Sequence, residues 1–544
     1  MSVFHRRRAA HAHYDYTRGS LGRGLARLAL PSCGEQVAWN VDAVVELYWV
    51  GKLGPEYLAA VSLCFMMTFF IRAIPLGARI AGGALVAQRV GAGDDEGAAL
   101  MAGQSITITI LYTGLLGVAG YLLAPWLMAL LTTDPRVREL GAVYFRVSFI
   151  FFIFYDTIAT LAHVLRGAGE PGYSLAGMVT SAATSTVLMP FLVFGWGPLP
   201  GMGIGGAPLA VGVGRIIGTS VVMAFLFSGR SRLHLRLDHL RPDGGVCWRI
   251  CVLGWPAAAQ NLLERGSNLI LVRILSLFGP VTVAAFGVSN RITNVSRMPA
   301  FGVQAAVRTL VGQNLGAGLP ERAVQSVRLS MWLTGFFMGS VTVGLFWFAP
   351  QVVLFFGLAG EAADVGSLCL RILAVSLLFE SARRVLAGAF HGAANAKPPM
   401  VVEGIVRWVV EIPLGYLAAV TLGMGGAGVW WTIAGGQVLA GAALFGWFFW
   451  WSAEGLKAQP LHIVRRPRAA SGGAPGLPAL RGFSASGSGD SRSRSGARGS
   501  GDGSRGRHRD GDSPAAAPRS GFPRGRGSCC SATCRPAAGR RSRG

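Results

Sequence analysis

Three carboxylates occupy one face of an apolar segment near the amino terminus. Asp42 and Glu46 are four residues apart, and Glu35 precedes Asp42 by seven residues. In a helix these positions share one face, and the stripe contains no Lys or Arg. A carboxylate inside a membrane costs at least about a few kcal/mol, so it usually marks an ion or substrate path. Asp42 and Glu46 are therefore candidates for coupling transport to a cation.

Like charges at this spacing oppose full ionisation of both groups, so one of them can bind and release a proton near physiological pH. A structural alternative is that these acids lie at the hydrated end of a helix, because Gly51 begins a loop. The functional interpretation is preferred for Glu46. For Asp42 both interpretations stay open.

A second acid, Glu264, has oxygen-bearing neighbours on its own helical face. Gln260 and Asn268 flank it at four residues on either side. Sodium ions and protonated groups both favour such oxygen ligands, so the pattern predicts a cation site. The alternative is a polar clamp between helices.

Glu380 has two possible environments, because Arg383 and Arg384 follow it at three and four residues. If these arginines pair with it, it is neutralised within one helix. If they extend toward the cytoplasm, Glu380 completes a possible sodium site with Glu264. Asp156 stays open as a cavity residue.

Composition places these acids in a membrane. The 544 residues are 51% hydrophobic and 14% charged, where a soluble domain averages about 25% charged. Apolar runs long enough for a spanning helix of about 20 residues number about twelve. They lie near 27–50, 57–85, 99–125, 139–165, 172–195, 206–228, 249–275, 283–310, 325–350, 365–390, 400–421 and 426–452.

The distribution of basic residues predicts the domain limits and the orientation. Lys and Arg gather before the first run, between the sixth and seventh, and after the twelfth, which indicates a multi-pass protein of the plasma (inner) membrane with both termini cytoplasmic. The expected parts are an amino-terminal tail (1–24), an N-lobe (25–228), a linker (229–248), a C-lobe (249–452) and a disordered tail (453–544). That basic tail is Arg/Ser/Gly-rich and holds too few aromatic residues for nucleic-acid binding.

The sequence repeats itself after a shift of 225 residues. Because the shift covers an even number of expected helices, the halves should be parallel repeats around a central cleft. The fold class expected is thus an all-α integral membrane protein with twelve transmembrane helices in two parallel six-helix lobes. Matching pairs are Pro31 with Pro256, Arg72 with Arg297, Gly77 with Gly302, Gln88 with Gln313, and Gly167 with Gly392.

Five segments, taken in order, resemble the multidrug and toxic compound extrusion (MATE) family of the MOP flippase superfamily. They are VELYWVGKLGPEYLAAVSL (45–63), ALVAQRVGAGDDEGA (84–98), LRGAGEP (165–171), GWPAAAQNLLE (254–264) and VGQNLGAGLPERA (311–323). The resemblance implies export of organic, often cationic compounds against proton or sodium entry. It also places Glu46, Glu264 and Glu380 on the acidic positions of the family, and Pro31 on the proline where helix 1 bends, with Pro256 as its repeat partner. Glu stands at 46 and 380 where the family pattern has Asp, and Asp42 is outside that pattern.

The mechanism that we expect is antiport by rocker-switch alternating access. Acids and aromatic rings hold an organic cation, and a proton or sodium ion at Glu46 or Glu264 displaces it. We expect the protein to act as a monomer in contact with membrane lipids and to need no cofactor. Because the motifs HExxH, GxSxG and GxxxxGK[ST] are absent, we expect no enzyme activity. A lipid-linked oligosaccharide or lipid flippase is the alternative. The cavity residues expected are Trp39, Asn40, Tyr48, Gln260, Asn268 and Asp156.

Overall fold

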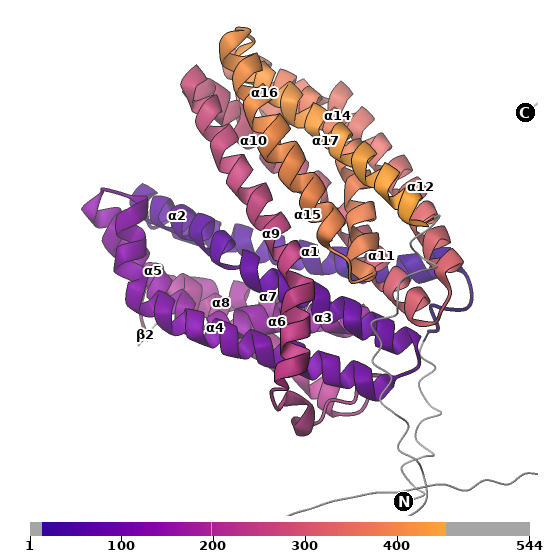
Figure 1. Ribbon diagram of the computed structural model, residues 1–544. Helices are drawn as coiled ribbons and strands as arrows, with labels where there is room; N and C mark the ends of the chain where they lie inside the picture. The colour runs from indigo at the N-terminus through magenta and orange to yellow at the C-terminus, as the bar shows by residue number, and fades with distance from the viewer. Residues whose placement is uncertain (1–13, 197–198, 453–544) are drawn as a thin grey trace, which may run out of the picture. The chain divides into compact units, whose positions relative to one another are not determined.

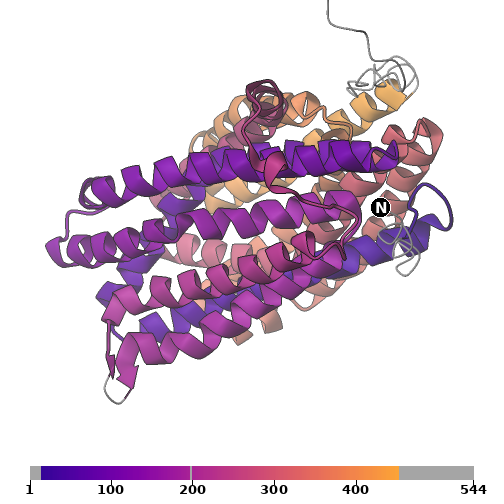
Figure 2. The same cartoon turned by 90° about the horizontal axis from the view of Figure 1, so that it is seen from below.

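The computed structural model describes residues 14–196 and 199–452, and almost all of these residues are helical. The basic tail and the first thirteen residues lie outside this range. The first half contains α1 (Leu21–Gly51), α2 (Pro55–Ile71), α3 (Ala73–Gly91), α4 (Asp95–Leu131), α5 (Pro135–Ile150), α6 (Phe152–Ala168), α7 (Pro171–Phe194) and α8 (Gly206–Phe227). A two-stranded hairpin, β1 (Gly195–Trp196) with β2 (Leu199–Pro200), joins α7 to α8, which lie side by side in Figure 2.

The second half begins with α9 (Gly244–Leu275) and continues with α10 (Pro280–Ser296), α11 (Met298–Gly316), α12 (Pro320–Trp347), α13 (Ala349–Phe355) and α14 (Glu361–Gly392). Its last spans are α15 (Lys397–Gly404) with α16 (Ile412–Tyr416), and α17 (Gly425–Trp450). Two π-helical stretches, Ile405–Glu411 and Leu417–Thr421, make α15 and α16 parts of one continuous segment. Figure 1 shows α14 beside α12 and α17, and these helices pack against one another.

If each broken helix is taken as one segment, the described residues form twelve long helical segments. This number agrees with the number of runs expected from the sequence. By length and composition, seven helices can cross a membrane, or up to nine if each of two bent pairs is one span. The segments that fall outside this set are α1, α9 and the pair α10–α11. These three carry interior charges such as Glu46, Glu264 and Arg297.

Three of the predicted runs, 57–85, 283–310 and 139–165, are broken helices. The run 57–85 divides at Arg72 into α2 and α3, and its repeat partner divides at Arg297 into α10 and α11. The run 139–165 divides at Phe151 with a bend of 53°, whereas its repeat partner α14 is continuous. Hydropathy gives the length of an apolar run and not its direction, so these bends were missed.

The starts of α2 and α10 have a clear local cause. Gly54 and Gly279 have φ of 131° and 91°, a region open to glycine and strained for other residues. Pro55 and Pro280 follow as the first helical residues, where a fixed φ and a missing N–H cost nothing. A Gly-Pro pair therefore turns the chain into each helix.

The halves meet through reciprocal contacts that follow the repeat. Helix α1 packs on α11, α9 packs on α3, and α3 packs on α11. Gln88 Nε2 donates to the Gly392 carbonyl at 3.1 Å, and its repeat partner Gln313 Nε2 donates to the Gly167 carbonyl at 2.9 Å. The same polar contact is thus made twice across the interface, once from each half.

Glycines allow this close approach of the two halves. A Cβ on Gly91 would lie 1.9 Å from the carbonyl oxygen of Gln313, and one on Gly316 would lie 2.0 Å from that of Gln88. No side chain fits at either position unless the backbone of the opposite half shifts. Gly91 and its repeat partner Gly316 therefore lie where the two halves touch.

Candidate functional site

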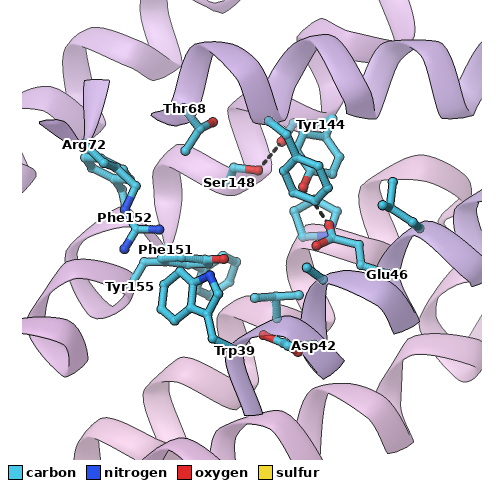
Figure 3. Close-up of a pocket in the computed structure, with 15 residues that line it drawn as sticks. Trp39, Asp42, Glu46, Thr68, Arg72, Tyr144, Ser148, Phe151, Phe152 and Tyr155 are labelled. Carbon is cyan, nitrogen blue, oxygen red and sulfur yellow. Dashed lines mark hydrogen bonds between the residues drawn. The ribbon is translucent and has the colours of Figure 1, made fainter. Parts of the chain in front are cut away.

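A cavity of about 160 Å³ opens inside the first half, among α1, α2, α5, α6 and α8. We name it the aromatic cavity (Figure 3). Asp42 and Glu46 reach it from α1, and Arg72 reaches it from the break between α2 and α3. The complete lining is Trp39, Asp42, Ala43, Glu46, Leu47, Phe65, Thr68, Arg72, Tyr144, Ser148, Phe151, Phe152, Tyr155, Pro208 and Val211.

The three acids of α1 have different partners, although they share one face. Glu35 pairs with Arg166 of α6 at 3.2 Å and also accepts from Ser174. Asp42 pairs with Arg215 of α8 at 2.6 Å and also accepts from Ser185. These arginines lie on other helices, so the sequence stripe gave no sign of them.

Glu46 is the exception on this stripe. The Tyr144 hydroxyl donates to its Oε1 at 2.6 Å, as Figure 3 shows. Its side chain is buried, and no Lys, Arg or His in the described part of the chain lies within ion-pair distance of it. A carboxylate without a counter-cation, beside a cavity, is the kind of group that a cation or a proton can neutralise.

The aromatic rings of the cavity are already in contact with guanidinium groups. Arg72 lies over Trp39 at 4.8 Å and over Tyr155 at 4.5 Å, and Arg215 lies over the same two rings at 4.6 and 4.7 Å. Trp39 lines this cavity, and its part in substrate binding stays a prediction. Its ring faces protein cations in this structure, so the expected cation–π contact with a substrate would compete with two arginines.

Asp156 is fully buried. Its Oδ1 accepts from Arg72 Nε at 2.9 Å and from Arg79 Nη1 at 2.8 Å. One carboxylate thus pairs with two arginines, so the group of three side chains carries a net positive charge. Asp156 anchors arginines here rather than lining the aromatic cavity.

The acids of the second half form a network with arginines. Glu380 pairs with Arg384 at 2.6 Å and with Arg297 at 2.9 Å. Glu264 lies 3.6 Å from Arg384 and 3.7 Å from Arg407, and its side chain is 24% exposed. Glu264 is therefore the more loosely held of the two acids.

The acids of the segment that contains α15 belong to the same network. Arg407 bonds to both Glu403 and Glu411, and Arg383 bonds to Glu403 at 2.6 Å. Glu403, Arg407 and Glu411 form a ladder at four-residue spacing, in which the arginine offsets the acids on either side. It also contacts Glu264 through Arg407, which helical spacing alone did not show.

The repeat relates the two sites residue by residue. Shifts of 225 place Trp39 on Glu264, Tyr155 on Glu380 and Arg72 on Arg297. Arg72 stacks on two rings in the first half, and Arg297 pairs with a carboxylate in the second. The same backbone positions thus present aromatic rings in one half and acids in the other.

Other residues expected at the site have different surroundings. Tyr48 is 57% exposed and lies under Lys52, outside the aromatic cavity, because it falls on another face of α1. Asn40 donates to the Gln36 carbonyl of its own helix. Gln260 contacts His391 at 3.2 Å, and Asn268 contacts Arg407 at 3.5 Å.

The expected helix-bending prolines lie inside helices, Pro31 within α1 and Pro256 within α9. Bending at these positions stays a prediction. Among the described residues no group of three or more His, Cys, Asp or Glu could hold a metal ion. At the possible sodium site of Glu264 and Glu380, an ion would have to displace Arg384, which contacts both carboxylates.

Comparison with known proteins identifies the fold. The profile of the MatE family matches residues 31–194 and again residues 256–417, which together are more than half of the chain. The chain belongs to the MATE family. The two matched stretches begin 225 residues apart, as the internal repeat predicts. This MATE protein is an integral, multi-pass membrane protein, with the two-lobe, twelve-helix fold expected from its sequence.

Relatives with assigned names are similar over most of this MATE chain. A probable multidrug resistance protein NorM of Deinococcus radiodurans is 27% identical over 449 residues, which cover 80% of this chain and 97% of the relative. YoeA of Bacillus subtilis, also a probable multidrug resistance protein, is 25% identical over 418 residues, covering 76% and 90%. A crystal structure of MATE in complex with MaL6 has a TM-score of 0.76 at 23% identity and covers 82% of this chain and 99% of that one.

Proposed function

We propose that this MATE protein is a multidrug efflux transporter that exports organic compounds in exchange for protons. The observation that carries the proposal is the Glu46 carboxylate, which lines the aromatic cavity without an ion-pair partner among the described residues. The names of the NorM and YoeA relatives support the multidrug part. The two halves of the chain, which the family profile matches separately, support alternating access.

Glu46 links the substrate to the proton in this mechanism. When ionised, it attracts the positive end of an organic compound in the cavity. When protonated, it loses that attraction and is less costly to enclose in an apolar environment. Substrate and proton therefore compete for one group, which is the requirement for exchange.

Tyr144 positions the carboxylate for this exchange. Its hydroxyl comes from α5 and bonds to one oxygen of Glu46, whereas Glu46 itself lies on α1. The neighbouring acids Glu35 and Asp42 are held by arginines. This difference favours Glu46 over Asp42 as the exchanging group.

We favour the proton over sodium as the coupling ion. Glu264 and Glu380 both contact Arg384, and a sodium ion needs several oxygen ligands of its own. Glu264 remains a second candidate for the proton-exchanging group, because its contacts with two arginines are longer than those of Glu380. Glu380 is held tightly, and we assign it a structural role.

The proposed surroundings are those expected from the sequence. We place the protein in the plasma (inner) membrane as a monomer, with both termini cytoplasmic and lipids around its apolar helices. A flippase for lipids with an anionic head group is the second candidate, favoured by the presence of Arg72 in the aromatic cavity. Flippase activity would predict movement of a labelled lipid-linked sugar in vesicles that transport no soluble dye.

Efflux from proteoliposomes tests the proposal. Wild type, Glu46→Gln and Glu264→Gln are reconstituted, and the export of a fluorescent organic cation is measured with proton and sodium gradients imposed separately. We expect the proton gradient to drive export by wild type. The export rate of Glu46→Gln should be at least about tenfold lower, because one charge of the site is removed. Glu139→Gln, which removes an exposed acid, is the matched control. Export driven only by sodium, or undiminished by Glu46→Gln, would contradict the assignment.

A further inference from the structure

A second cavity of about 260 Å³ lies next to the aromatic cavity. Two residues, Trp39 and Arg72, line both cavities. We name it the arginine chamber. Its cationic lining comes from both halves of the chain, with Arg79 on α3, Arg166 on α6 and Arg265 on α9. The full lining is Glu35, Gln36, Trp39, Arg72, Leu76, Arg79, Ile158, Ala159, Ala162, His163, Arg166, Ser174, Met178 and Arg265.

The chamber carries a surplus of positive charge. Apart from Arg265, whose charge interacts with that of Glu264, three arginines line it against one lining carboxylate, Glu35, which is paired with Arg166. Asp156 adds a second carboxylate behind the wall, where Arg72 and Arg79 share it. The local field of the chamber therefore favours a negative group.

Two of these arginines keep donors available. Within the described chain, Arg72 bonds to a carboxylate only through Nε and Arg79 only through Nη1. The buried Nε of Arg79 has no hydrogen-bond partner there, and its side chain is only 5% exposed. Unused guanidinium N–H groups beside a cavity match the oxygens of a carboxylate, with which arginine forms short, charge-assisted bonds.

The two cavities together define a substrate with two ends. The aromatic cavity presents Glu46 without a counter-cation, and the arginine chamber presents surplus guanidinium groups across the shared wall of Trp39 and Arg72. We propose that the arginine chamber binds the carboxylate of a zwitterionic aromatic compound whose cationic end lies at Glu46. This assignment rests on the proposed efflux function, and it adds the substrate class.

Equilibrium binding tests the chamber without requiring transport. The probes are a rhodamine with a free carboxylate, which is a zwitterion, and its methyl ester, which is a cation of otherwise the same structure. Fluorescence anisotropy of each dye is measured with the full chain in detergent. We expect wild type to bind the zwitterion at least as tightly as the ester.

The informative variant is Arg79→Gln, because Arg72 remains to pair with Asp156. We expect the Kd of the zwitterion to rise roughly tenfold, or about 1.4 kcal/mol, and the Kd of the ester to change by less than about twofold. Arg146→Gln removes an exposed arginine of the same half and should change neither value. Arg265→Gln, which changes the lining arginine of α9, is predicted to act like Arg79→Gln and serves if that variant does not fold.

The outcomes separate the two proposals. If wild type binds the ester but not the zwitterion, or if both chamber variants weaken the two dyes equally, the chamber assignment is wrong and the efflux proposal stands. If binding follows our expectation but no gradient drives export of either dye from proteoliposomes, the chamber is a binding site and the efflux proposal fails.

Discussion

At the scale of single residues, three acids on one helical face have three different environments. Spacing alone identified Glu35, Asp42 and Glu46 as one stripe, and composition placed them in the membrane. Their partners Arg166 and Arg215 come from α6 and α8, and no pattern within α1 could reveal them. Sequence analysis thus found the acids, whereas their division into paired and unpaired groups required the structure.

The pair of Asp42 and Arg215 gives a prediction about stability. Both side chains are buried, and removing one partner of a buried pair costs about 3–5 kcal/mol, because the other charge is left alone. Arg215→Met should therefore lower the melting temperature in detergent by at least about 5 °C. Asp42→Asn together with Arg215→Met should recover part of that loss. An unchanged melting temperature for Arg215→Met would show that the pair contributes little.

Tyr144 gives a second prediction at this scale. Tyr144→Phe removes the hydroxyl that bonds to Glu46 and retains the ring that packs against Phe65. We expect a rate of proton-driven efflux between those of wild type and Glu46→Gln, because the carboxylate is still present but less firmly placed. Transport assays in proteoliposomes would measure this rate. Tyr121→Phe, a change of the same kind at an exposed ring, is the control.

At the scale of helices, the repeat predicted more of the structure than hydropathy did. The matched residues Gly77 and Gly302 lie at corresponding contacts, the first against Gly254 and Ala258 of α9 and the second against the carbonyl of Ala29 on α1. Breaks at Arg72 and Arg297 also correspond, although uniform apolar runs concealed them. The break at Phe151 has no counterpart in α14, so the repeat does not determine every bend.

The touching glycines give a prediction about the transport cycle. Gly91→Ala and Gly316→Ala each place a methyl group against a carbonyl of the opposite half, and overpacking of this kind costs typically about 1–3 kcal/mol. We expect both to slow export by a similar factor, roughly tenfold, because they oppose the closed contact. Gly114→Ala and Gly339→Ala are also repeat partners, with no atom within 4 Å of the added Cβ, and should have little effect. Equal effects of all four variants would contradict the proposed role of the contact.

At the scale of the whole molecule, charge separates the transport unit from the basic tail. Eighteen Lys or Arg and four Asp follow from Lys457 onward, outside the described residues, whereas the MatE matches end at residue 417. A chain that ends after Ser452 should therefore retain export at a rate within about twofold of wild type, measured per protein at the membrane. A loss of transport with normal membrane insertion would assign the tail a part in the mechanism.

The central claim is that substrate and proton compete for Glu46. The most direct measurement is proton release when substrate is added to the purified protein in weakly buffered detergent solution near neutral pH, followed with a pH indicator. We predict release from wild type, none from Glu46→Gln, and unchanged release from Glu139→Gln. Equal proton release from wild type and Glu46→Gln would contradict the claim, as would substrate binding to wild type without any release.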